Sequence, residues 1–212
     1  MIVYGSTLSP FVRKLMAYGA EKGLTLELQP AFPGSTDPEF RKISPFGKIP
    51  GFRDGDFTIS DSSAIIAYLE AKHPEPALIP TEPKARATAI WYDEFADTIL
   101  VPSMAKLFFN RIVAPRFMGQ EGDLEAADRA EREELPPLFA YLESVIPASG
   151  FLVEDRLTLA DLAVASPLIN IEHAGYVLDR DAYPKTWAYA AAIHARPSFA
   201  GLIAAEKAML GR

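Results

Sequence analysis

A proline-rich segment at residues 74–83, PEPALIPTEP, sets the strongest constraint on how this chain can fold. It contains four prolines in ten residues. Proline lacks a backbone N–H and fixes φ, so the segment cannot form a helix or a central strand and is typical of a stiff linker. The chain of 212 residues therefore divides into two parts, which we predict to be domains at residues 1–76 and 84–212.

The first part carries alternating strand and helix patterns. Strands are expected at residues 2–4, 24–29, 49–54 and 57–60, and helices at 10–22, 37–42 and 61–73. The first two strands, joined through a helix, should be parallel. The last two flank Asp54-Gly55, a hairpin signal, and should be antiparallel. This order of elements predicts a thioredoxin-like α/β fold.

The second part reads as entirely helical. Helices are expected at residues 84–111, 124–146, 159–171, 183–195 and 199–210. Prolines inside these ranges, Pro102, Pro136-Pro137 and Pro167, should kink or split their helices. Thr158 and Asp161 have the spacing of a capping box, with Thr158 as the N-cap of the third helix.

Composition excludes several classes of function. The chain has no cysteine, which rules out disulfides, thiolate metal sites and a protein thiol nucleophile. The net charge of −7 argues against nucleic acid as a partner, because neutralising phosphates requires a basic surface. We find no signal peptide and no apolar run long enough to span a membrane, and expect a soluble cytoplasmic protein.

Ser9 is the first residue that could carry chemistry. It precedes Pro10, which suits the first position of a helix, so Ser9 is the expected N-cap. The free amides and the positive end of the helix dipole favour an anion beside its hydroxyl. The alternative is that Ser9 only caps the helix, which contributes about 1 kcal/mol.

Two further segments could likewise either bind a ligand or have a purely structural role. Pro50 follows Ile49 at the start of a strand and is a candidate cis peptide that would leave the Ile49 backbone free to pair with an extended peptide. Lys48 beside it could hold a carboxylate, or be a solvated turn lysine. Asp61 and Ser62 begin a helix, where they could bind an α-amino acid group or act only as caps. Together the three segments suit a short, doubly charged peptide.

These residues lie in longer motifs: YGSTLSPFVRK at 4–14, GKIPGFRDGDFTISDSSAIIAYLE at 47–70 and LTLADLAVASPL at 157–168. With them, the whole chain resembles a glutathione S-transferase of the serine-dependent kind. The resemblance implies a thioredoxin-like domain that binds glutathione, an all-helical domain, a homodimer, a role in detoxification and no metal. It also implies a second substrate, a small apolar electrophile, bound between the domains.

The resemblance also assigns roles to individual residues. Ser9 takes the place of the serine that stabilises the glutathione thiolate, with Tyr4 as the competing candidate. Lys48 would hold the glycyl carboxylate of glutathione, and Ile49, before Pro50, would pair with the cysteinyl backbone. Asp61 and Ser62 would hold the γ-glutamyl group.

The second-substrate site is less defined by the sequence. Phe11 flanks the expected thiol position, and Phe108 and Arg111 lie near the end of the first long helix of the second part. Phe108 could equally pack in the core and Arg111 could be a surface residue. An Arg111 that faced the substrate would suit an anionic one.

Two other functions remain open at this stage. One is a glutathione-dependent isomerase or dehalogenase, although the double Ser-Cys signature of serine-type isomerases is absent because Pro10 follows Ser9. The other is a non-catalytic interaction module on the same fold, since fold does not determine function.

Overall fold

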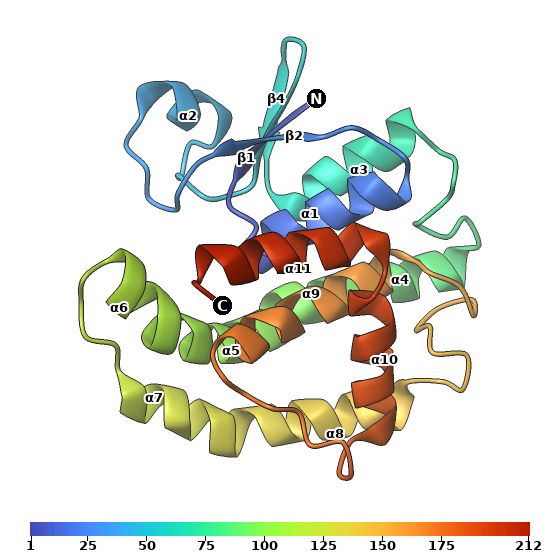
Figure 1. Cartoon of the computed structure of the whole chain (residues 1–212). Helices are drawn as coiled ribbons and strands as arrows, with labels where there is room; N and C mark the ends of the chain where they lie inside the picture. The colour runs from blue at the N-terminus through green and yellow to red at the C-terminus, as the bar shows by residue number, and fades with distance from the viewer. The chain divides into compact units, whose positions relative to one another are not determined.

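The computed structural model describes all 212 residues, which form two compact units. The first contains residues 1–81 and 197–212, and the second contains residues 82–196. The first unit's main segment ends at Thr81, within the proline-rich segment. The last helix, α11 (Pro197–Met209), packs against α1 (Pro10–Glu21) in the first unit. Figure 1 shows α11 in red beside α1 in blue.

A four-stranded sheet with the order β2-β1-β3-β4 forms the centre of the first unit. Its strands are β1 (Ile2–Gly5), β2 (Glu27–Pro30), β3 (Gly51–Asp54) and β4 (Phe57–Ser60). β1 pairs with β2 in parallel, and β3 pairs antiparallel with both β1 and β4, which confirms the predicted directions. β2 starts later than predicted because the N–H of Leu24 closes the end of α1 by donating to the carbonyl of Gly19 (2.8 Å).

Residues alternate between the two faces of this sheet. Phe52 contacts Tyr68 of α3 (Ser62–Lys72) on one face. On the other face, the ring of Tyr4 lies 6.4 Å from that of Phe40 in α2 (Pro38–Ile43). At Gly5, a Cβ atom would lie 2.6 Å from Cγ2 of Val12, so only glycine allows α1 to approach the end of β1 this closely.

The second unit is entirely helical, and its chain runs through two long helical segments before α9. The first comprises α4 (Pro83–Phe95), η1 (Ala96–Leu100), α5 (Val101–Phe108), η2 (Phe109–Val113) and α6 (Ala114–Phe117). The second comprises α7 (Leu124–Arg129), η3 (Ala130–Glu134) and α8 (Leu135–Val145). α9 (Leu159–His173) packs against α4 and α5, and α10 (Pro184–His194) packs against α8 and α9.

The three η segments are π-helical turns, and each ends two residues before a proline: Pro102, Pro115 and Pro136. Proline removes a backbone donor and clashes with the carbonyl four residues earlier, and a π turn widens the helix where that bond is lost. The helices therefore continue past Pro102 and Pro136-Pro137, where the sequence predicts kinks or splits. α9 also continues as one helix with Pro167 inside it.

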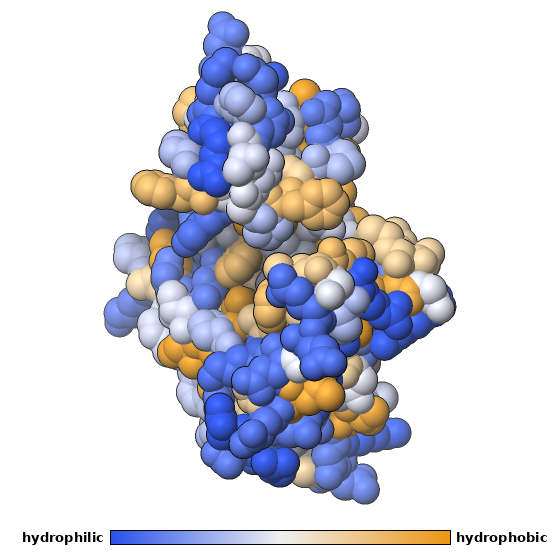
Figure 2. Space-filling model, turned by 90° about the vertical axis from the view of Figure 1, so that its left-hand side faces the viewer, coloured by the Kyte–Doolittle hydropathy of each residue, from blue (hydrophilic) through white to orange (hydrophobic).

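α9 is the core helix of its unit, since every residue from 159 to 171 is buried. Hydrophilic residues cover much of the molecular face drawn in Figure 2, with apolar residues between them. No helix is both long enough and apolar enough to cross a membrane.

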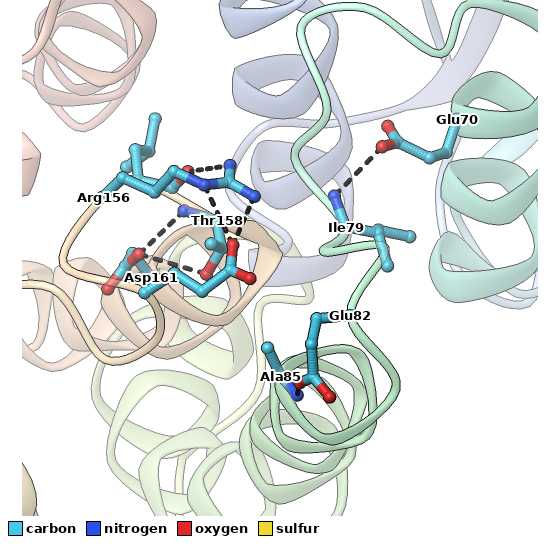
Figure 3. Close-up of polar contacts among 9 residues, drawn as sticks. Glu70, Ile79, Glu82, Ala85, Arg156, Thr158 and Asp161 are labelled. Atoms are coloured by element: carbon cyan, nitrogen blue, oxygen red, sulfur yellow. Dashed lines mark hydrogen bonds and ion pairs between the residues drawn. The ribbon is translucent and has the colours of Figure 1, made fainter.

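The predicted capping box at the start of α9 is confirmed (Figure 3). The N–H of Thr158 donates to Oδ2 of Asp161 (2.9 Å), and the Thr158 hydroxyl lies 3.3 Å from the same oxygen. Oδ1 of Asp161 accepts from the N–H of Leu152 (2.9 Å). Both Thr158 and Asp161 are fully buried, so this carboxyl group fixes the chain that enters the core helix.

We expect Thr158→Ala to destabilise the fold by about 0.5–2 kcal/mol, the usual contribution of an N-cap hydroxyl. The substitution should leave glutathione affinity unchanged, because the capping box lies in the second unit. Chemical denaturation would measure the loss, and glutathione titration would provide the control. Unchanged stability together with weakened binding would contradict this assignment.

Candidate functional site

The strand register brings the three candidate segments to one end of the sheet. Tyr4 near the end of β1 pairs with Gly51 at the start of β3, and Gly51 pairs with Ser60 at the end of β4. The residues that follow β1, precede β3 and follow β4 must therefore meet at this end. The N–H of Asp61 also donates to the carbonyl of Pro50 (3.4 Å), which joins two of the segments directly.

Ser9 occupies the N-cap position of α1, with extended backbone (φ −79°, ψ 127°). Its carbonyl accepts the first helical hydrogen bond, from Arg13 N–H (3.0 Å), but its side chain makes no capping bond. The hydroxyl is half-buried and forms no hydrogen bond within the chain. The reading of Ser9 as only a helix cap therefore loses its main support, and the hydroxyl is available to a ligand.

Tyr4 lies in a different environment. Its ring contacts Phe40 of α2, and the guanidinium of Arg53 lies 5.6 Å from the ring centre, a cation–π geometry. These contacts hold Tyr4 on the α2 face of the sheet, whereas α1, which Ser9 caps, packs with α3 on the opposite side. The geometry favours a packing role for Tyr4.

The peptide bond between Ile49 and Pro50 is cis, as the sequence suggested. Neither the N–H nor the C=O of Ile49 is hydrogen bonded within the chain, although its side chain is buried. A buried segment with an unpaired backbone can pair with an extended peptide as an added strand does. Lys48 beside it is exposed, and its ammonium group has no ion-pair partner in the chain.

Two residues that the sequence analysis did not single out hold the segment containing Lys48. Ser44 donates from Oγ to the carbonyl of Lys48 (2.7 Å). Arg41 donates to the carbonyls of Ser35 (2.6 Å) and Pro45 (3.0 Å). The signal for Ser44 was present, because serine before proline favours a turn. Nothing in the local sequence indicates the carbonyl contacts of Arg41.

Asp61 combines capping with an unusual backbone conformation. Its φ of 88° lies in the region that favours glycine, at an estimated cost of about 1–3 kcal/mol for other residues. Oδ1 accepts from the N–H groups of Ser63 and Ala64 (both 3.0 Å), so the capping reading is correct. Oδ2 makes no hydrogen bond in the chain and remains available to an ammonium group. Ser62, at the first turn of α3, is 3% exposed.

The candidates from the second unit have partners of their own. Phe108 is buried, at 7% exposure, which agrees with core packing. The guanidinium of Arg111 lies 2.8 Å from Asp128 and 2.5 Å from Glu131. Two carboxylates thus already neutralise the positive charge of Arg111, which the sequence analysis considers as a group that could bind an anionic substrate. In the first unit, Phe11 is half-buried, one residue after Pro10 at the start of α1.

No group of three histidine, cysteine, aspartate or glutamate side chains is arranged to hold a metal ion. The candidate residues offer hydroxyl, carboxylate, ammonium and backbone groups. A hydroxyl at a helix N-terminus can donate to an anion, and the cap region of α3 can bind an amino acid group.

A mixed four-stranded sheet flanked by helices in the first unit, followed by a helical unit, is the fold of the glutathione S-transferases. Family models of the glutathione S-transferase N-terminal and C-terminal domains match residues 3–77 and 108–206. The chain belongs to the glutathione S-transferase family, and it is a glutathione transferase.

Individual relatives agree with this membership. The chain is 31% identical to a glutathione S-transferase of Hyoscyamus muticus, over 96% of this chain and 97% of the relative. It is 30% identical to glutathione S-transferase 3 of Zea mays, over 96% of this chain and 93% of the relative. A crystal structure of a glutathione S-transferase from Rhodospirillum rubrum F11 superposes with a TM-score of 0.86 at 28% identity, over 95% and 90% of the two chains.

Proposed function

We propose that this glutathione transferase binds glutathione at the end of the sheet where β1, β3 and α3 meet, and that Ser9 stabilises its thiolate. The thiolate then attacks a small apolar electrophile. The observation that carries the proposal is the Ser9 hydroxyl, which lies at the N-terminus of α1 without a capping bond. A hydroxyl with no structural partner at this position is available to donate to sulfur.

The binding groups are distributed as a tripeptide with charges at both ends requires. Lys48 offers a cation for the glycyl carboxylate, and Ile49 offers an unpaired N–H and C=O for the cysteinyl backbone. At the other end, the free oxygen of Asp61 suits the γ-glutamyl ammonium group. Ser62 and the first turn of α3 suit the γ-glutamyl carboxylate.

The required change in thiol acidity is within reach of such a site. A free thiol has a pKa of about 8.5, so near neutral pH most of it is protonated and unreactive. Lowering this pKa by about 2 units requires about 2.7 kcal/mol of preferential stabilisation of the thiolate. A charge-assisted hydrogen bond from Ser9 together with the N-terminus of α1 can supply that amount.

We further propose an apolar second substrate. Phe11 follows Ser9 by two residues and is half-buried at the start of α1. Phe108 and Arg111 remain candidates from the second unit, but the two ion pairs of Arg111 reduce its value as an anion-binding group. A panel of aryl halides, epoxides and cis-enone diacids would test this. Turnover of the diacids alone would indicate an isomerase instead.

Retention on glutathione resin, with elution by free glutathione, is the direct test of binding. A non-catalytic module would pass through the resin, whereas a transferase, isomerase or dehalogenase would be retained. Failure to bind would overturn the proposed site as a whole.

Lys48→Ala should raise the KM for glutathione by about 5- to 30-fold, corresponding to about 1–2 kcal/mol, and change kcat much less. The reason is that the carboxylate contact is remote from sulfur and contributes equally to the ground and transition states. Steady-state kinetics would measure both constants. Lys42→Ala is the matched control, because Lys42 is an exposed lysine of the same unit that pairs with Glu39 (2.7 Å). Equal effects of the two substitutions would return Lys48 to the role of a solvated turn residue.

We also propose that the protein is a cytoplasmic homodimer, which the family membership supports. A stable dimer should bury more than about 1,000 Å² in total. Sedimentation at micromolar concentration should then give twice the chain mass of 23.2 kDa, and a single 23.2 kDa species would contradict the proposal.

A further inference from the structure

Helix α11 lies along α1 within the first unit (Figure 1). Polar side-chain contacts join the two helices near both ends. At the end of α1, Glu21 accepts a hydrogen bond from Ser198 at the start of α11 (2.5 Å). In the first turns of α1, Arg13 contacts Glu206 near the end of α11. The two helices are therefore antiparallel, and α11 holds α1 along its length.

The Arg13–Glu206 contact is a fully buried, bidentate ion pair. Nε of Arg13 donates to Oε1 of Glu206 (2.9 Å), and Nη2 donates to Oε2 (2.8 Å). Both side chains are 0% exposed. Charged residues are almost never completely buried unless they are paired, and two parallel bonds permit only one relative orientation of the groups. Packing alone does not explain the pair, because apolar residues of similar volume often stabilise a fold as well or better.

The position of Arg13 connects this pair to the site. The N–H of Arg13 donates to the carbonyl of Ser9 (3.0 Å), the bond that closes the first turn of α1. A displacement of Arg13 therefore displaces the turn that carries the Ser9 hydroxyl. Errors of about 1 Å in the placement of a catalytic group can cost about 100-fold in rate.

We infer that Arg13 and Glu206 are positioning residues of the glutathione site: the ion pair fixes the first turn of α1 so that the Ser9 hydroxyl points at the sulfur. The C-terminal helix is thereby part of the scaffold of the site, although it follows Ser9 by almost two hundred residues. This inference rests on the proposed role of Ser9.

Glu206→Gln tests the inference, since the amide keeps one acceptor oxygen and loses the charge and the second bond. We expect the apparent pKa of the bound glutathione thiol to rise and kcat/KM to fall by about 3- to 10-fold, with the KM for glutathione within about twofold of wild type. Ser198→Ala is the matched control, because it removes a contact between the same two helices at the end far from Ser9. It should lower the melting temperature without changing the thiol pKa, which ultraviolet absorbance of the thiolate would follow.

A second variant separates positioning from stability. Replacing both charged residues, as Arg13→Met with Glu206→Met, should recover part of the stability, because neither member of the pair remains buried without the other. The raised thiol pKa should persist. If this double variant has a normal thiol pKa, or if Glu206→Gln and Ser198→Ala act alike on it, the inference is wrong.

Ser9→Gly, measured in the same assay, distinguishes this failure from failure of the proposed function. A raised thiol pKa in Ser9→Gly with no specific effect of Glu206→Gln overturns only the positioning role. An unchanged thiol pKa in Ser9→Gly overturns the role of Ser9, and the inference with it.

Discussion

Replacing Ser9 with glycine should lower kcat and kcat/KM together by roughly 10- to 150-fold, the loss of a charge-assisted hydrogen bond of about 1.5–3 kcal/mol. The affinity for glutathione should change little, because the hydroxyl touches only the sulfur. An interaction that stabilises the reactive anion appears in kcat and kcat/KM equally. Steady-state kinetics with varied glutathione and a saturating electrophile would measure both constants.

The pH dependence gives this prediction a second readout. Without the hydroxyl, the pKa of the bound thiol should rise toward its free value of about 8.5. The thiolate is the reactive form, so activity of the Ser9→Gly variant should recover as the pH rises through that range. Ser9→Thr should retain part of the rate, because it keeps a hydroxyl.

Ser9→Gly could also lower activity by destabilising α1, but the structure indicates that this effect is small. Ser9 makes no side-chain capping bond, and glycine is tolerated at N-cap positions at a cost of only a few tenths of a kcal/mol. The melting temperature of Ser9→Gly should therefore be nearly that of wild type. Tyr4→Phe is the matched control and should change the rate little, because the Tyr4 ring contacts Phe40 and Arg53. Full activity in Ser9→Gly with loss of activity in Tyr4→Phe would transfer the role to Tyr4.

Features that depend on residues close in sequence could be predicted from the sequence. The hairpin at Asp54-Gly55 and the capping box of Thr158 and Asp161 are local arrangements with a recognisable spacing, and the structure contains both. The candidate residues meet at one end of the sheet because of the order and direction of the strands. The sequence patterns predict these directions.

Features that depend on contacts between residues far apart in the sequence could not be predicted in this way. Arg13 and Glu206 are 193 residues apart, and neither local pattern indicates a partner, so the sequence does not show that α11 packs against α1. The prolines signal disturbed helices, but the choice of a π turn over a break depends on the packing around each one. A serine at an N-cap position normally bonds to the helix, and only the structure shows that Ser9 does not.

A larger loss of stability should follow from Asp161→Ala. This carboxyl group accepts hydrogen bonds from the N–H groups of Thr158 and Leu152, and an alanine would leave both donors without a partner. An unsatisfied buried donor costs about 1–3 kcal/mol, so we expect a loss of about 2–5 kcal/mol. Glu125→Ala is the control for loss of an acidic side chain, because Glu125 is exposed on α7.

The stability lost in Asp161→Ala should depend on pH. The burial of Asp161 determines whether the loss grows or shrinks as the pH rises. Burial raises the pKa of Asp161 to about 6, although its hydrogen bonds act in the opposite direction. A carboxyl group whose pKa is raised on folding stabilises the folded state fully below its unfolded pKa of about 3.9, and this contribution is lost as the pH rises through about 6. The difference of about 2 units corresponds to about 3 kcal/mol.

Wild-type stability should therefore decline between about pH 4 and pH 6 through this group, whereas Asp161→Ala lacks that decline. The difference in unfolding free energy between the two proteins should be larger near pH 4.5 than near pH 7.5, by about 2 kcal/mol, since part of the change lies below pH 4.5. Urea denaturation at the two pH values would measure it. A difference that is equal at both values, or larger at the higher one, would mean that hydrogen bonds to the ionised carboxylate outweigh the cost of its burial.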